Sequence, residues 1–152
     1  MEERILKARE NIKKYNKQSV ITLLEGDATD ILERLVNGKT SHIDNFTTES
    51  DNVPVEPMCG KFDFIFMDAA KGQYMNFFPN VMKLLSDDGV LLTDNVLQDG
   101  AVAKSRYGVT RRDRTIHTRM REYLYTLTHM DEINTIVLPV GDGVTISTKS
   151  KK

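Results

Sequence analysis

Acidic side chains follow two apolar stretches of this chain, at positions where they could bind a metal ion. Asp68 comes directly after FDFIFM (62–67), and Asp94 and Asn95 come directly after VLLT (90–93). If the two stretches form neighbouring parallel strands, their carboxyl ends lie about 5 Å apart at one edge of the sheet. Two close carboxylates repel each other, and a hard divalent cation removes that cost. Two carboxylates and an amide oxygen suit Mg²⁺, Mn²⁺ or Ca²⁺ better than zinc.

Simpler interpretations of the same residues stay open. Aspartate at the end of a strand is often a helix N-cap or a turn former. Lys71 follows Asp68 closely, in MDAAKGQY, and is expected at the start of the next helix, over the same strand ends. It could act there as a general base if burial or a nearby cation favours its neutral form. It could equally be a surface lysine paired with Asp68.

The spacing of apolar residues predicts the elements that position these side chains. Helical spacing predicts helices over 2–15, 28–36, 73–86 and 112–128, the last with Ile116, Met120, Tyr123, Leu124 and Leu127 on its inner face. Short apolar runs predict strands over 19–24, 62–67, 90–93, 133–138 and 144–148. FDFIFM is typical of a strand buried on both faces. Asp87-Asp88-Gly89 is expected to stop a helix and turn the chain, and 37–60 and 96–111 are expected loops.

The order of these elements predicts an α/β protein. Strands that alternate with helices favour a mostly parallel sheet. The last two strands flank Gly141-Asp142-Gly143, which predicts an antiparallel hairpin at the end of the chain.

Composition is that of one ordinary globular domain. The chain has 152 residues, of which 39% are hydrophobic and 28% charged, and its formal net charge is −1. This balance gives no global basic field for nucleic acid. The single cysteine, Cys59, excludes an internal disulfide framework. No apolar run approaches the roughly 20 residues of a membrane helix, and the first fifteen residues lack the apolar region of a signal peptide. We therefore expect a cytoplasmic protein that does not enter a membrane.

A local basic cluster follows the second acidic strand end. Its members lie within eighteen residues: Lys104, Arg106, Arg111, Arg112, Arg114, Arg119 and Arg121. Such a cluster beside a catalytic site could hold an anionic RNA backbone. It could also be the solvated face of a helix.

Three segments together resemble the cation-dependent O-methyltransferases, which include the catechol and caffeoyl-coenzyme A enzymes. They are FDFIFMDAAKGQY, GVLLTDNVLQDG and LPVGDGVTIS. The resemblance implies a Rossmann-like class I methyltransferase fold. It also implies that Asp68, Asp94 and Asn95 bind the cation and that Lys71, with Asp68, takes part in catalysis.

The resemblance extends to the cofactor, S-adenosylmethionine. Asp27 and Ala28, in LLEGDATD, match the segment that borders its adenine, and Asp68 to Ala70 match residues near its methionine moiety. In the implied mechanism a chelated, ionised hydroxyl attacks the sulfonium methyl group, and alignment supplies much of the rate.

Within the family, the likeness is greatest to bacterial tRNA 5-hydroxyuridine methyltransferases. DNVLQDG followed by TRRDRTIHTRMREYL carries it. It implies tRNA as the substrate, with Arg106, Arg111, Arg112 and Arg114 as RNA-binding residues, and a homo-oligomer. A small catechol-like substrate is the alternative.

The chain departs from the family pattern before its first expected strand. It shows no Gly-rich turn for the methionine end of the cofactor and no acidic residue for its ribose. The family's sheet has two further strands between those expected at 19–24 and 62–67. We therefore expect a single truncated domain over 1–152, with an inserted loop at about 37–60. A non-catalytic fragment is one alternative, and an acidic-pocket phosphoryl-transfer domain, which would lack a phosphate loop, is another.

Overall fold

The computed structural model describes residues 2–38 and 60–150, and the inserted loop expected at 37–60 lies mostly outside them. The chain divides into two compact units, Met1–Cys59 and Gly60–Lys152.

The first unit contains two helices. These are α1 (Glu2–Lys14) and α2 (Ala28–Val36). The Asp27 side chain caps α2, because its Oδ1 accepts a hydrogen bond of 2.8 Å from the Thr29 backbone N–H. Leu35 is the buried residue of α2.

The strand expected over 19–24 does not form. This segment is a turn followed by irregular chain, and Val20 and Ile21 are exposed. A strand exists only when a neighbouring strand satisfies its backbone groups. No strand among the described residues pairs with this segment.

The second unit is built on a four-stranded sheet with the order β1-β2-β4-β3. Its strands are β1 (Phe62–Met67), β2 (Leu85–Thr93), β3 (Ile133–Leu138) and β4 (Val144–Lys149). β1 and β2 are parallel, whereas β4 is antiparallel to both β2 and β3. The α/β class and the closing antiparallel hairpin are therefore confirmed.

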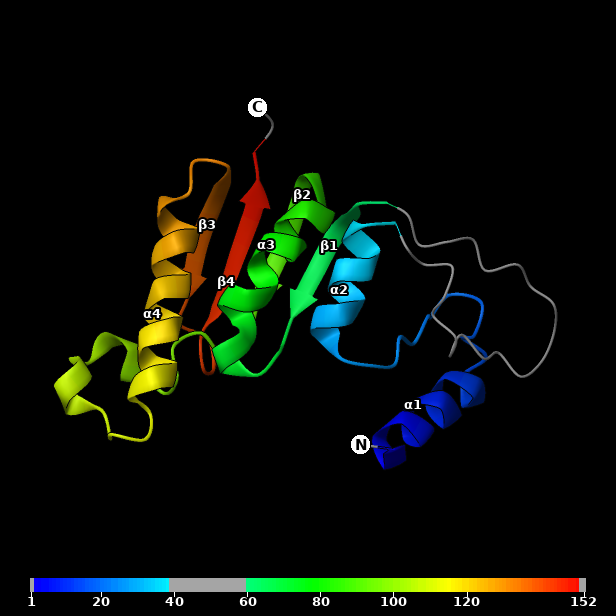
Figure 1. The fold of residues 1–152 in the computed structure, drawn as a ribbon, viewed down its shortest axis with the longest axis horizontal. Helices are drawn as coiled ribbons and strands as arrows, with labels where there is room; N and C mark the ends of the chain where they lie inside the picture. The colour runs from blue at the N-terminus through cyan, green and yellow to red at the C-terminus, as the bar shows by residue number, and fades with distance from the viewer. Residues whose placement is uncertain (1, 39–59, 151–152) are drawn as a thin grey trace. The chain divides into compact units, whose positions relative to one another are not determined.

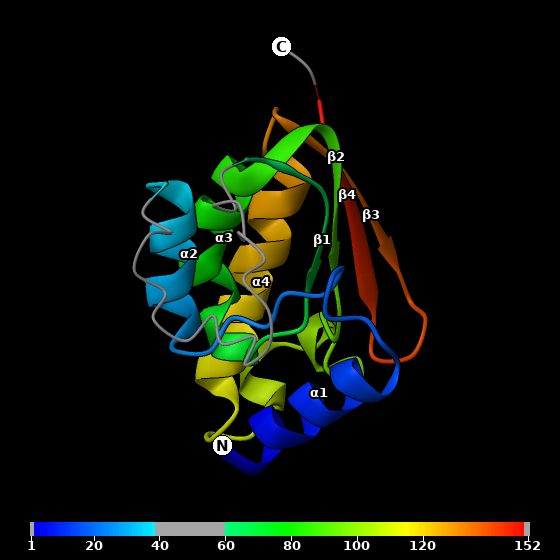
Figure 2. The same ribbon diagram turned by 90° about the vertical axis from the view of Figure 1, so that its right-hand side faces the viewer.

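Two helices cover one face of this sheet, α3 (Tyr74–Leu84) and α4 (Arg114–His129) (Figures 1 and 2). Their buried side chains form the core together with Leu91 of β2. These side chains are Tyr74, Phe78, Val81 and Met82 from α3 and Met120, Tyr123 and Leu127 from α4.

The inner face of α4 differs from the prediction at one position. His117 is 1% exposed, whereas Ile116 is 37% exposed. The Nε2 atom of His117 bonds to the Lys104 carbonyl at 3.1 Å, whereas its Nδ1 atom is buried without a hydrogen-bond partner among the described residues.

The prediction that β1 is buried on both faces is wrong. Ile65 and Met67 face the core, but Phe64 is 58% and Phe66 is 54% exposed. Successive side chains of a strand point to opposite faces, and no helix of 60–150 covers the second face. Burial of this face depends on contacts that the strand's own sequence does not specify.

Asp87-Asp88-Gly89 lies inside β2 and not beyond a helix end as expected. Phe62 pairs with Leu85 and Phe64 pairs with Val90, so several extra residues bulge out of β2 between these pairs. Asp88 has a positive φ of 64°, which allows the sharp bend. The chain therefore bends at Asp87-Asp88-Gly89 as predicted, but the bend is a bulge within a strand and does not follow a helix.

Tyr123 and Thr93 join α4 to β2 through a buried hydrogen bond of 2.7 Å between their hydroxyl groups. We expect Tyr123→Phe to lower the free energy of unfolding by about 1–3 kcal/mol, because the Thr93 hydroxyl loses its buried partner. Urea unfolding of Tyr123→Phe, Thr93→Val and the double variant measures the coupling. Additive losses would show that the two hydroxyls do not depend on each other.

Candidate metal and cofactor site

The register of β1 and β2 brings the predicted acidic residues to one edge of the sheet. Met67 pairs with Thr93, so Asp68 and Asp94 are the first residues beyond paired strand ends. The Asp94 backbone N–H also donates to the Met67 carbonyl, at 3.2 Å. Asp68 is exposed, whereas Asp94 and Asn95 are half-buried. The sequence therefore predicted this juxtaposition correctly.

The backbone bends sharply at Asn95. Its φ is 54°, a left-handed conformation that asparagine tolerates better than most residues. The Asp94 Oδ1 atom accepts a hydrogen bond of 2.7 Å from the Asn95 backbone N–H, and the Tyr74 hydroxyl donates to the Asp94 carbonyl at 2.9 Å. These bonds fix the direction in which the chain leaves β2.

Tyr74 reports the electrostatic character of this edge. Burial, together with the negative charges of Asp68, Asp94 and Asp142, raises the pKa of its phenol to about 12. Three carboxylates therefore act on one phenol. Their hard oxygen atoms fit a divalent cation. Among the described residues no group of three or more His, Cys, Asp or Glu side chains is arranged to hold a metal ion, so the candidate set is two carboxylates and the Asn95 amide.

We expect the free energy of unfolding to fall as the pH rises from about 10 to about 12, because of Tyr74. In that window the unfolded chain has lost the phenol proton and the folded chain retains it, so added base favours unfolding. The contribution is fully present below the unfolded pKa. Denaturant unfolding at about pH 9.5 and about pH 11.5, with wild type and Tyr74→Phe, measures it. An equal loss in both proteins would assign the effect to other groups.

Lys71 does not pair with Asp68, its expected surface partner. It begins a 3₁₀ turn (Lys71–Gln73), and its Nζ atom lies 3.0 Å from Oδ2 of Asp142. Asp142 also accepts a hydrogen bond from the backbone N–H of Asp99. This bond and the Lys71 ammonium hold the pKa of Asp142 below its usual value, against the opposing effect of burial. Sequence reasoning missed Asp142, although its tight turn joins two expected strands at this same edge.

The turn at Asp142 is joined to the loop after β2. The Val96 N–H donates to the Gly143 carbonyl at 3.0 Å, and the Leu97 N–H donates to the Asp142 carbonyl at 2.9 Å. Gly143 has a φ of 85°, and a Cβ atom there would lie 2.3 Å from Cγ of Leu97. A glycine is therefore required where the hairpin meets this loop.

The predicted cofactor residues fall in both units. Asp27 is the N-cap of α2 and Ala28 is its first residue, and hydrogen bonds from Thr29 lower the pKa of Asp27. Ala70 precedes the 3₁₀ turn of Lys71. Asp68 and Ala70 therefore lie in one short loop, while Asp27 and Ala28 belong to the separate first unit.

The basic cluster is split between exposed and engaged side chains. Lys104, Arg106, Arg111 and Arg112 are exposed. The other three members bond to backbone carbonyls: Arg114 to Val109 at 3.4 Å, Arg119 to Gly72 at 2.9 Å and Arg121 to Val102 at 3.1 Å. Part of the cluster therefore holds the loops around the strand ends.

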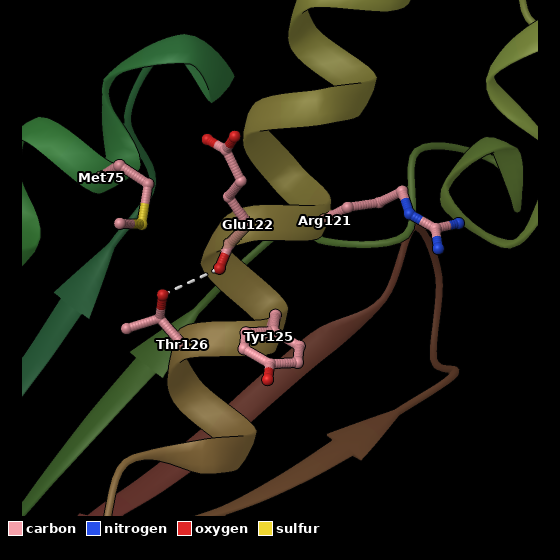
Figure 3. Close-up of a pocket in the computed structure, with 5 residues that line it drawn as sticks. All are labelled: Met75, Arg121, Glu122, Tyr125 and Thr126. Atoms are coloured by element: carbon pink, nitrogen blue, oxygen red, sulfur yellow. Dashed lines mark hydrogen bonds between the residues drawn. The ribbon is translucent and has the colours of Figure 1, made fainter.

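A surface pocket of about 440 Å³ lies elsewhere, on α3 and α4 (Figure 3). Its lining residues are Met75, Arg121, Glu122, Tyr125 and Thr126. Thr126 Oγ1 donates to the Glu122 carbonyl within this patch. None of the residues predicted for the metal or the cofactor lines it.

Among the described helices, none has the length and apolar character to cross a bilayer.

Comparison with known proteins identifies the family. A sequence model described as O-methyltransferase matches residues 48–150, which include the whole strand-end site. The chain belongs to this O-methyltransferase family. A caffeoyl-CoA O-methyltransferase of Citrus natsudaidai is 30% identical over 128 residues, which are 84% of this chain and 48% of that protein. A caffeoyl-CoA O-methyltransferase of Medicago sativa is 28% identical over 147 residues, 92% of this chain and 50% of that protein.

Solved O-methyltransferase-type structures share the fold. The SAH-bound methyltransferase of Podospora anserina matches with a TM-score of 0.71 and 25% identity, covering 99% of this chain and 58% of that one. A Staphylococcus aureus structure matches with a TM-score of 0.74 and 27% identity, covering 99% and 61%. The chain therefore spans about half the length of the curated relatives that it matches.

Proposed function

We propose that this chain contributes the metal-binding edge of an S-adenosylmethionine-dependent, cation-dependent O-methyltransferase. The pairing of Met67 with Thr93 is the observation that carries the proposal, because it sets Asp68 beside Asp94 and Asn95 at the carboxyl edge of the sheet. Ligands of open α/β sheets bind at this edge. Family membership supports the same reaction type.

The residues of the site would have separate roles in binding the cation, the cofactor and the substrate. Asp68, Asp94 and Asn95 would hold Mg²⁺ or a similar cation, which when bound supplies Lewis-acid chemistry that favours the ionised form of a coordinated hydroxyl. Asp68 and Ala70 would border the methionine end of S-adenosylmethionine, and Asp27 and Ala28 its adenine. Lys71 would act on the substrate hydroxyl. A substrate with two adjacent oxygen atoms fits this arrangement, because both oxygens can face the cation.

Calorimetric titration tests the reaction class. We expect S-adenosylmethionine to release heat on binding, and Mg²⁺ together with a dihydroxy aromatic substrate to permit transfer of a labelled methyl group. No binding heat with or without Mg²⁺ would contradict the enzyme proposal. The alternative of a non-catalytic fragment gains support if Mn²⁺ still binds in that case.

For the substrate, we propose the 5-hydroxyl of 5-hydroxyuridine in tRNA. That base offers a hydroxyl beside a carbonyl oxygen, and the exposed Arg106, Arg111 and Arg112 support an anionic partner. A small catechol-like substrate is the second candidate, and the similarity to caffeoyl-CoA O-methyltransferases favours it.

Methyl transfer to hydroxyuridine-containing tRNA, to a caffeoyl thioester and to free catechol separates these substrates. Transfer to tRNA should weaken steeply with added salt, because phosphate contacts release counterions. Arg111→Gln with Arg112→Gln should reduce transfer to tRNA and leave transfer to catechol unchanged. Activity confined to catechols would contradict the tRNA proposal.

We also propose that the chain associates with itself. The exposed Phe64 and Phe66 of β1, the edge strand of the described sheet, support this proposal.

A further inference from the structure

Tyr107 is the most exposed of the large hydrophobic side chains that the structure describes. It is 88% exposed, and the next, Val20, is 73% exposed. Tyr107 is the middle residue of a 3₁₀ turn (Arg106–Gly108) in the loop 100–113 between β2 and α4, the yellow-green segment beside the start of α4 in Figure 1. A ring this exposed adds little to the packing of the chain and is open to a partner.

The turn that presents Tyr107 is held in place on both sides. Ser105 Oγ accepts a hydrogen bond of 3.2 Å from the Tyr107 backbone N–H. Three side chains of α4 bond to carbonyls of the loop, namely Arg121 to Val102, His117 to Lys104 and Arg114 to Val109. The loop is therefore anchored before and after Tyr107, which lowers the cost of ordering it when a partner binds.

Positive charge accompanies this ring along the loop. Residues 100–112 include no Asp or Glu but four cationic side chains, all exposed: Lys104, Arg106, Arg111 and Arg112. Asp113, which follows them, accepts a hydrogen bond of 2.5 Å from Thr110 Oγ1. The formal net charge of the whole chain is −1, so the loop is a local exception that attracts anions.

An exposed aromatic ring among cations fits an unpaired nucleotide. The base can stack on the ring while the cations contact the phosphates. An anionic membrane surface would meet the same charges, but anchoring in a membrane needs a larger apolar face. Val102 and Val109, the valines of this loop, are 8% and 9% exposed, so the Tyr107 ring is the one large apolar group that the loop offers. These observations favour a nucleotide over a membrane.

We propose that Tyr107 stacks on an unpaired base of an RNA strand whose phosphates contact the exposed cations of this loop. The Val102 N–H donates to the Leu97 carbonyl at 3.3 Å, which ties the loop to the segment that follows Asp94 and Asn95. A base held by Tyr107 therefore brings its neighbours toward the edge of the sheet at which methyl transfer is proposed. This inference rests on the proposed function for the choice of RNA, but binding can be measured without catalysis.

Fluorescence anisotropy of a labelled oligouridine, about 12 nucleotides long and unpaired, tests the stacking with the intact chain. We expect Tyr107→Ala to weaken binding by about 5- to 150-fold, the range for one base stacked on an aromatic ring. Tyr107→Phe keeps the ring and should bind within about twofold of wild type. Tyr107→Leu keeps apolar contact without a flat ring, so it should lose as much as Tyr107→Ala.

Tyr125→Ala is the matched control. Tyr125 is also exposed, at 64%, but its ring already stacks on His129, with the ring centroids 3.9 Å apart. This variant should bind the oligouridine like wild type. Unchanged affinity in Tyr107→Ala, or equal losses in Tyr107→Phe and Tyr107→Leu, would overturn the proposal. Binding to phosphatidylserine vesicles but not to the oligouridine would also overturn it and would assign the loop to a membrane.

The salt dependence of binding separates the ring from the charges. Arg106→Gln should reduce the slope of log affinity against log salt by about 0.7, the value for one phosphate contact on a single strand. Tyr107→Ala should leave this slope unchanged, because the cations stay in place. If Tyr107 served only to hold the loop together, its loss would displace the cations and lower the slope as well.

Tyr107→Trp gives a direct signal of stacking, because the chain contains no tryptophan. A base stacked on the indole should quench its fluorescence as the oligouridine binds. Bound oligouridine with undiminished fluorescence would contradict stacking at this position.

The proposed methyl transfer and this inference can fail separately. RNA that binds through Tyr107 but receives no methyl group would contradict the proposed function and leave the stacking role intact. Methyl transfer to tRNA, with oligouridine binding that does not depend on Tyr107, would do the reverse. A wild-type chain that binds no oligouridine at low salt would overturn the stacking role, while calorimetry with S-adenosylmethionine would still decide the reaction class.

Discussion

Asp94→Asn is expected to weaken Mn²⁺ binding to this chain by about 100-fold or more, because even partners outside the ligand set cost about 10–100-fold in metal affinity. The substitution removes one negative charge and little else. The new amide oxygen can still accept the hydrogen bond from the Asn95 N–H that Asp94 Oδ1 accepts now. The bend after β2 should therefore persist, and the loss reports on the charge. Electron paramagnetic resonance of free Mn²⁺ measures the affinity without any need for catalysis.

Asp68→Asn should give a loss of similar size, since Asp68 ends the neighbouring strand. Asp131→Asn, which changes an exposed carboxylate ahead of β3, is the control and should bind Mn²⁺ like wild type. Unchanged affinity in both strand-end variants would contradict the metal site. Asp68 and Asp94 would then be turn formers, the simpler interpretation that their positions in the sequence also allow.

Gly143→Ala is expected to lower the free energy of unfolding by about 2–5 kcal/mol. A left-handed backbone costs an alanine about 1–2 kcal/mol, and forcing an extra carbon into a packed contact costs about 1–3 kcal/mol. The added Cβ would lie 2.7 Å from Cβ of Leu97, an atom near the backbone that cannot swing aside. Leu97 would have to move together with the loop that follows Asp94 and Asn95. Weaker Mn²⁺ binding should accompany the loss of stability.

Gly141→Ala is the matched control for that experiment. Gly141 also has a positive φ, of 57°, but a Cβ there meets nothing within 4 Å. It should show the backbone cost alone, about 1–2 kcal/mol. Leu97→Ala in the Gly143→Ala background should restore part of the stability by opening the contact. If the two glycine variants unfold at the same denaturant concentration, the close contact with Leu97 has no energetic consequence.

The predictions that held were those with a local physical cause. β1 and β3 occupy the predicted ranges, because the alternation and β-branching that favour a strand lie within the strand itself. α2 also begins where Asp27 caps it. The position of Asp68 beside Asp94 followed from two strand ends and the parallel pairing of consecutive βα units. The family resemblance pointed to the same residues, and the family assignment agrees with it.

The predictions that failed depended on neighbours distant in sequence. The run over 19–24 has the composition of a strand, but no described strand pairs with it. Phe64 and Phe66 look like core residues, yet no helix of their unit covers that face. On α4, His117 is buried in place of the predicted Ile116, and its ring bonds to the Lys104 carbonyl. Each outcome follows from what lies across the sheet or the helix.

The sequence by itself determined the α/β class, the two acidic strand ends and the lysine that follows the first of them. Apolar periodicity and residue type act over a few positions and can be seen along the chain. Only the tertiary structure decided which group Lys71 meets. Asp142 lies 71 positions away, and the hairpin that carries it reaches the site by pairing β4 with β2. The charge balance of the site is set by that pairing, because ion pairs depend on distance in space and not on distance along the chain.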